Sequence, residues 1–279
     1  MNQQISASFK KEKLAFFRTK RLLMLILIVV GWGILGPVLL RGLGVMIDSL
    51  TPVYDDLGMD VSGMTQILAT YVSTGVASSI SDITSVGLIA FLLMINSFAG
   101  GEQKKRSIMI PRTSGLRSTG YLLPKYIIYP LTALILAIVA AFASWGASVL
   151  VFEINDVAVG GVLSAGLIAG VCLMFYICIH LTLGTATGRA GMSSVLVIIV
   201  SLLVPGLFSV LGSDYIYNPF LMGTMAVSAI SGDGILMVMN SEIVMTLLIA
   251  LVLMVIFYFL ALFAQNAKKI DNSGNEIKL

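Results

Sequence analysis

The spacing of the charged residues constrains this chain more than any other feature. Between Asp82 and Glu102 lie 19 uncharged residues, and between Lys125 and Glu153 lie 27. A helix needs roughly 20 apolar residues to cross a bilayer core of about 30 Å. Only 11% of the residues are charged, whereas soluble domains carry about 25%. We therefore expect an integral membrane protein.

Six uncharged stretches are long enough to act as spans. The first follows two basic residues and is longer than the roughly 7–15 apolar residues of a cleaved signal peptide. No small-residue cleavage site closes it, so we expect it to be retained. The predicted spans are residues 22–40, 83–99, 126–151, 159–183, 193–211 and 243–263.

The charges between these stretches predict the orientation. Short loops rich in Lys and Arg stay in the cytoplasm. With both termini inside, every Lys and Arg except Arg41 is cytoplasmic, and most acids are outside. The sequence thus predicts one all-α transmembrane domain over 1–279, with six spans, N-in and C-in. Residues 41–82 form its first outer loop, and no span contains a charged residue.

The two ends of this layout carry unusual segments. Residues 1–21 are basic, and Phe9, Phe16 and Phe17 share one helical face. This predicts a cytoplasmic amphipathic helix at the membrane interface; the alternative is a basic flank that only fixes orientation. Residues 212–241 are too apolar for an exposed loop and too broken for a span. They predict a re-entrant helical hairpin, or a segment that lies on the outer face.

Residues 100–125 form a basic elbow between the second and third spans, with six bases against Glu102. One interpretation is a loop that only fixes orientation. The other is a docking surface for a cytoplasmic partner.

Few side chains could carry catalytic chemistry. His180 is the only histidine, and Cys172 and Cys178 fall within one apolar stretch. We expect no disulfide, no metal site and no histidine-based hydrolase. No nucleotide-binding Gly-rich motif is present, so any ATP must be bound by another chain.

Some residues within the spans are candidates for other roles. Asn96, Tyr176 and His180 either line a path through the bundle or form hydrogen bonds between helices. Gly166 and Gly170 are four residues apart, a spacing that favours close helix packing.

The layout resembles the permease subunit of ABC transporters, in the type-2 exporter family. The elbow carries the resemblance through Glu102, the pair Ser107-Ile108, the turn at residues 114–118 and the closing Lys125. Gly115 stands where the family has Pro, and Pro124 stands where it has Gly.

The resemblance implies a half-transporter in a bacterial-type plasma membrane. Two permease chains, identical or related, would dock two ABC ATPase subunits, which would bind ATP and magnesium. This chain would bind no cofactor and no nucleic acid, and it would not itself be an enzyme. Spans two and five would open the path. The implied ATPase-coupling residues are Glu102, Lys104, Lys105, Arg106, Arg112, Ser114, Gly115 and Arg117.

Two alternatives come from other classes. One is a non-transporting membrane protein with an assembly or sensory role. The other is an intramembrane enzyme, which the lack of an acid, base and nucleophile within the spans disfavours. The cargo, the direction of transport and the choice between homodimer and heterodimer stay open.

Overall fold

The computed structural model is almost entirely helical. It describes residues 2–56, 71–98, 117–211, 217–231, 241–270 and 276–278. Six of the described helices are long and apolar enough to cross a membrane, which confirms the predicted number of spans. These helices cover Lys20–Leu50, Val72–Asn96, Ser118–Val151, Val159–Thr187, Ala190–Phe208 and Ser241–Asn266.

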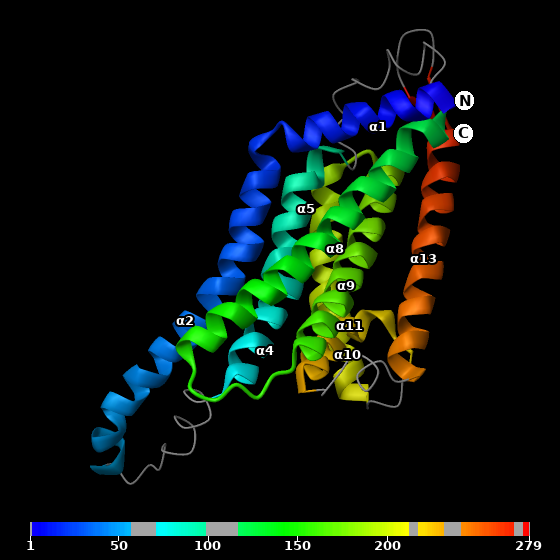
Figure 1. Ribbon diagram of the computed structural model, residues 1–279. Helices are drawn as coiled ribbons and strands as arrows, with labels where there is room; N and C mark the ends of the chain where they lie inside the picture. Colours follow the sequence, from blue (N-terminus) through cyan, green and yellow to red (C-terminus); the bar gives the residue numbers. More distant parts are fainter. Residues whose placement is uncertain are drawn as a thin grey trace.

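The six helices form a bundle whose members alternate in direction (Figure 1). The second span is continuous through a π-helical turn, η1, which joins α4 to α5. The elements are α2 (Lys20–Asp56), α4 (Val72–Asp82), η1 (Ile83–Gly87), α5 (Leu88–Asn96), α8 (Ser118–Val151), α9 (Val159–Thr187), α10 (Ala190–Leu211) and α13 (Ser241–Asn266).

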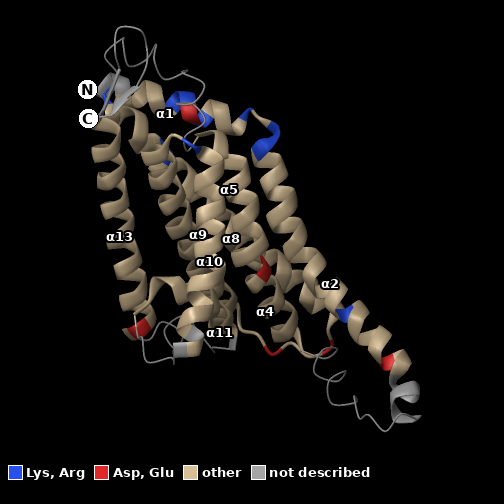
Figure 2. Ribbon diagram, turned by 180° about the vertical axis from the view of Figure 1, so that it is seen from behind, with Lys and Arg blue, Asp and Glu red and all other residues tan. Residues whose placement is uncertain are grey.

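The N-terminal helix α1 (Asn2–Phe17) lies across one end of the bundle. The C-terminal end of α13 lies at the same end (Figure 1), followed by a short antiparallel pair, β1 (Lys268–Ile270) and β2 (Glu276–Lys278). Most Lys and Arg residues of the described chain gather at this end, and most Asp and Glu lie toward the other (Figure 2). We call the end that carries α1 the basic end.

Helix α9 is the central element of the bundle. It is the most buried of the six spans and packs against α8, α10, α13 and the short helix α11 (Met222–Ser228). Gly166 and Gly170 lie where α9 crosses α8. A Cβ atom at Gly170 would lie 3.0 Å from the Cα of Leu134, and one at Gly166 would lie 3.1 Å from the Cα of Ile138. The missing side chains therefore permit the close approach of the two backbones.

Both ends of the predicted first outer loop, 41–82, are helical. Helix α2 continues to Asp56, and α4 begins at Val72. Within the predicted loop, residues 57–70 lie outside the described chain. In the Ser- and Thr-rich helix α4, the side chains of Ser73 and Ser79 have hydrogen-bond partners in other segments. The Ser79 hydroxyl, for example, donates to the Gly33 carbonyl at 3.1 Å.

The prediction that no span contains a charged residue is wrong. Asp82 lies inside the helix that covers Val72–Asn96, and its carboxylate accepts a hydrogen bond from Trp32 Nε1 at 3.0 Å. Lys125 lies inside α8 rather than at the end of an exposed elbow, and it is 1% exposed. Both positions are tolerated because each side chain has partners within the bundle.

Of the predicted segment 212–241, the structure describes Ser241, the first residue of α13, and residues 217–231. The latter residues form one short helical run: η3 (Pro219–Leu221), α11 (Met222–Ser228) and η4 (Ala229–Ser231). Met222 and Ala226 are fully buried, and α11 packs against α9 and α4. The Asn218 side chain starts the run by accepting a hydrogen bond from the Phe220 amide at 3.0 Å.

Candidate functional site

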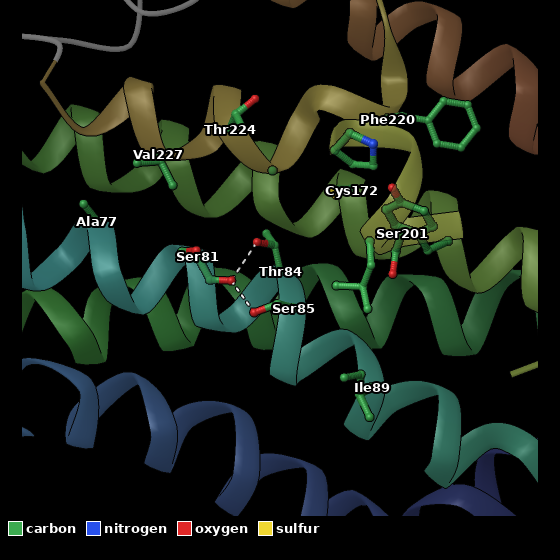
Figure 3. Close-up of a pocket in the computed structure, with 14 residues that line it drawn as sticks. Ala77, Ser81, Thr84, Ser85, Ile89, Cys172, Ser201, Phe220, Thr224 and Val227 are labelled. Carbon is green, nitrogen blue, oxygen red and sulfur yellow. Dashed lines mark hydrogen bonds between the residues drawn. The ribbon is translucent and has the colours of Figure 1, made fainter. Parts of the chain in front are cut away.

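A cavity of about 460 Å³ lies between the second, fourth and fifth spans and the short helix α11 (Figure 3). Its volume falls within the range of about 300–1,000 Å³ that is typical of small-molecule sites. It is lined by Ala77, Ser81, Thr84, Ser85 and Ile89 of the second span, Cys172 and Tyr176 of α9, Ser201, Leu202 and Pro205 of α10, and Phe220, Gly223, Thr224 and Val227 of the segment that includes α11.

The second span supplies a wall of hydroxyl groups. Ala77, Ser81, Thr84 and Ser85 follow helical spacing and face the cavity together (Figure 3). Thr84 and Ser85 lie in the π-helical turn η1, and such turns are frequent at functional sites. The turn therefore presents two neighbouring hydroxyl groups to one cavity.

The opposite walls combine aromatic rings with further hydroxyl groups. The Phe220 ring meets the Phe175 ring edge-on at 5.3 Å and the Tyr176 ring at 6.2 Å between centroids. These contacts hold the start of the α11 segment against the middle of α9. Ser201 and Thr224 add hydroxyl groups from α10 and α11.

The mouth of the cavity is open at the surface of the isolated chain. The side chains of Ser81, Leu202 and Thr224 are exposed there. None of the described residues that line the cavity is charged. The cavity can therefore hold a molecule that is partly apolar and partly hydrogen-bonding.

A second polar site lies at the basic end, where α1 meets α8. Glu12 and Lys125 are 2% and 1% exposed, and the nearest Lys125 Nζ–Glu12 Oε1 distance is 3.9 Å. Lys125 Nζ also donates to the Phe98 carbonyl at 2.8 Å and to the Tyr121 hydroxyl at 2.9 Å. The Tyr129 hydroxyl donates to Glu12 Oε2 at 2.6 Å. We call these five residues the inner polar cluster.

Aromatic rings enclose the inner polar cluster. Tyr129 stacks on Phe98 at 5.2 Å and meets Phe16 of α1 edge-on at 5.2 Å. Arg21, at the start of α2, bonds Ser97 and lies over the Phe98 ring. The cluster thus joins α1, α2, the end of the second span and α8 at one point.

The structure separates the three candidate path-lining residues. Tyr176 lines the cavity, whereas Asn96 and His180 are not among its lining residues. His180 Nδ1 is 3.0 Å from the Ser193 hydroxyl, which joins α9 to α10. Within the described chain, His180 Nε2 and Asn96 Oδ1 are buried without a hydrogen-bond partner.

The predicted coupling residues lie mostly outside the described chain. Of that set only Arg117 is described, directly before α8. The other members are Glu102, Lys104, Lys105, Arg106, Arg112, Ser114 and Gly115.

Sequence reasoning singled out one residue of the cavity, Tyr176, and missed the rest of both sites. The stripe of Ala77, Ser81, Thr84 and Ser85 is a helical pattern that could have marked one face of the second span. Glu12, the one acid in a basic segment, could have marked an inward-facing position. Its pairing with Lys125 has no signal in a single sequence, because the two residues are far apart along the chain.

Together, these features define a multi-pass helical membrane protein with a cavity among its spans. Among the described residues, no three His, Cys, Asp or Glu side chains gather to hold a metal ion. No protein-family model matches the chain, and no curated protein matches it in sequence.

Proposed function

We propose that this chain is the membrane-spanning permease subunit of an ATP-driven ABC exporter. It works as a dimer, with a separate ATPase subunit docked on the basic elbow of each chain. The basic end faces the cytoplasm of a bacterial-type cell, so the chain is N-in and C-in. Helix α1 then lies at the inner membrane interface, and α11 re-enters from the outer side.

One observation carries this proposal: α8 links the elbow directly to the cavity-lining helix. It begins at Ser118, immediately after the elbow residue Arg117, and runs unbroken for 34 residues. Along that length it packs against α9, which lines the cavity with Cys172 and Tyr176. A push on the elbow would therefore reach the cavity through two stiff, closely packed helices.

The inner polar cluster supports the same mechanism. Lys125 lies two helical turns after the start of α8 and ties that helix to Glu12 of α1 and to Phe98, beyond the end of α5. Movement of the elbow would carry α1 and the inner end of the second span with it. The second span and α10 both line the cavity, as expected for helices that open a path.

The test is recovery of an ABC ATPase with this chain. The chain is expressed together with its neighbouring genes and purified in mild detergent, either as wild type or as the double variant Arg112→Glu, Arg117→Glu. Reversing two elbow charges should lower ATPase recovery several-fold and abolish ATP-dependent transport, while the amount of chain in the membrane stays unchanged.

Arg189→Glu is the matched control, because Arg189 is exposed in the turn between α9 and α10 at the same basic end. This variant should retain the ATPase. Equal recovery of the ATPase with the elbow variant, or no ATPase recovered with the wild type, would contradict the proposal.

A further inference from the structure

We propose that the cavity binds an uncharged amphipathic molecule that carries hydrogen-bond donors, such as hydroxyl or amide N–H groups. This inference rests on the proposed function, because the bound molecule would be the transported cargo. It goes further by naming the chemical class that the cavity selects.

Of the six hydroxyl groups in the described lining, all except those of Ser81 and Tyr176 donate their protons within their own helical segments. Thr84 Oγ1 donates to the Ile80 carbonyl at 3.1 Å, and Ser85 Oγ donates to the Ser81 carbonyl at 2.8 Å. Each bond stays within the helix that carries the hydroxyl, as is usual for Ser and Thr in apolar helices.

The same holds on the other walls. Ser201 Oγ donates to the Ile198 carbonyl at 2.9 Å, and Thr224 Oγ1 donates to the Leu221 carbonyl at 2.7 Å. A hydroxyl that has donated its proton offers only lone pairs to a ligand. Four of the six lining hydroxyl groups, from three walls, therefore act as acceptors, and a ligand must supply the donors for these four.

Pro205 leaves one backbone carbonyl of α10 without its usual helical donor. Proline has no backbone N–H, so it cannot donate to the carbonyl four residues earlier in the helix. That carbonyl belongs to Ser201, which itself lines the cavity.

The absence of charged side chains from the described lining favours a neutral ligand. The described lining contains no charged side chain, and the nearby Asp82 carboxylate accepts a hydrogen bond from Trp32 of α2. A charged head group would lie at membrane depth without a counter-charge, which is costly. The rings of Phe220 and Tyr176, with Ile89 and Leu202, supply apolar surface for the rest of the molecule.

The experiment measures binding of radiolabelled hexyl β-glucoside to the full chain in lipid nanodiscs, after subtraction of binding to empty nanodiscs. This probe is neutral, rich in hydroxyl donors and has a short apolar tail. We expect saturable binding without any ATPase present.

Three competitors with the same tail test the need for a hydrogen-bond donor and the need for neutrality separately. Each competitor is used at the same membrane-bound concentration. Hexyl methyl ether is neutral but has no donor, hexyltrimethylammonium is a cation without a donor, and hexyl sulfate is an anion. None should displace the glucoside. Displacement by the ether would overturn the donor requirement, and displacement by either ion would overturn the neutral class.

Isosteric variants locate the binding site. Thr84→Val and Thr224→Val each remove one acceptor from a different wall and keep the side-chain volume. Each should weaken glucoside binding roughly three- to tenfold, the usual worth of one hydrogen bond. Thr132→Val is the control, because Thr132 Oγ1 also bonds within its own helix, to the Ile128 carbonyl, but lies outside the cavity.

Failure of this inference differs from failure of the proposed function. Absence of saturable binding, or equal binding by both cavity variants and wild type, overturns the ligand class even if an ATPase docks on the elbow. Saturable, donor-dependent binding that both cavity variants weaken upholds the cavity assignment even if no ATPase is recovered.

Discussion

At the scale of single residues, small side chains decide how closely the helices of this bundle approach. Gly170 faces Leu134 of α8 so closely that an added Cβ would lie 3.0 Å from its Cα and 3.2 Å from its carbonyl oxygen. Backbone atoms cannot turn away as a flexible side chain can. Lipid tails are as apolar as the helices, so tight packing of this kind is a main force holding membrane helices together.

Gly170→Val should therefore separate α9 from α8. The overpacked side chain should lower the free energy of unfolding by about 1–3 kcal/mol, measured by SDS titration of the purified protein. Gly146→Ala is the control, because no atom lies within 4 Å of a Cβ at Gly146. Its effect should stay within about 1 kcal/mol, toward greater stability. Similar losses for both variants would contradict the packing argument.

At the scale of elements, α1 is fixed by more than its apolar face. The sequence predicted a helix whose Phe9, Phe16 and Phe17 face the membrane together. In the structure Phe16 is fully buried against the bundle, whereas Phe17 is half-exposed. Glu12, one turn before Phe16, points inward with it and reaches Lys125 and Tyr129. A polar anchor thus sets the rotation of α1 about its own axis.

Breaking this anchor should release α1. Lys125→Met leaves Glu12 buried without its main cationic partner, and the loss of one member of a buried pair costs about 3–5 kcal/mol. The variant should unfold at lower SDS concentration, and trypsin should cut it faster at Lys13. Because Met can fill the space left by Lys, the double variant Glu12→Gln, Lys125→Met should lose less than the sum of the single variants.

Lys11→Met is the comparison for the anchor. Lys11 Nζ lies 3.7 Å from Glu12 Oε1, but its side chain is 56% exposed. Exposed pairs contribute about 0–1 kcal/mol, so this variant should stay close to wild type. If Lys11→Met proved as damaging as Lys125→Met, burial would not explain the anchor.

At the scale of the whole molecule, the proposed orientation places the two ends of the bundle in different compartments. Cysteine substitutions report this directly. Lys11→Cys is at the basic end, and Glu153→Cys is at the opposite end with 77% of its native side chain exposed. A membrane-impermeant maleimide added to intact cells should label Cys at 153 and leave Cys at 11 unlabelled until the membrane is opened. The reverse pattern would invert the proposed topology.

The number of spans and the charge asymmetry could be predicted from the sequence because both depend on local composition. The prediction placed the start of the second span eleven residues too late. Hydropathy counts Ser79 and Asp82 as polar, whereas in the structure both have partners on α2. The cavity was beyond reach for another reason, since its walls come from four segments that only tertiary packing brings together.

The π-helical turn at Ile83–Gly87 sets the two halves of the second span out of phase. Before the turn, buried residues such as Val76, Ile80 and Ile83 are separated by four and three positions in the sequence. The step from Ile83 to Leu88 is five, after which Phe91 and Ile95 resume steps of three and four. One extra residue rotates the half after the turn by about 100° relative to an uninterrupted helix. Ser81, Thr84 and Ser85 can thus face the cavity while the half after the turn keeps its own apolar stripe in the core.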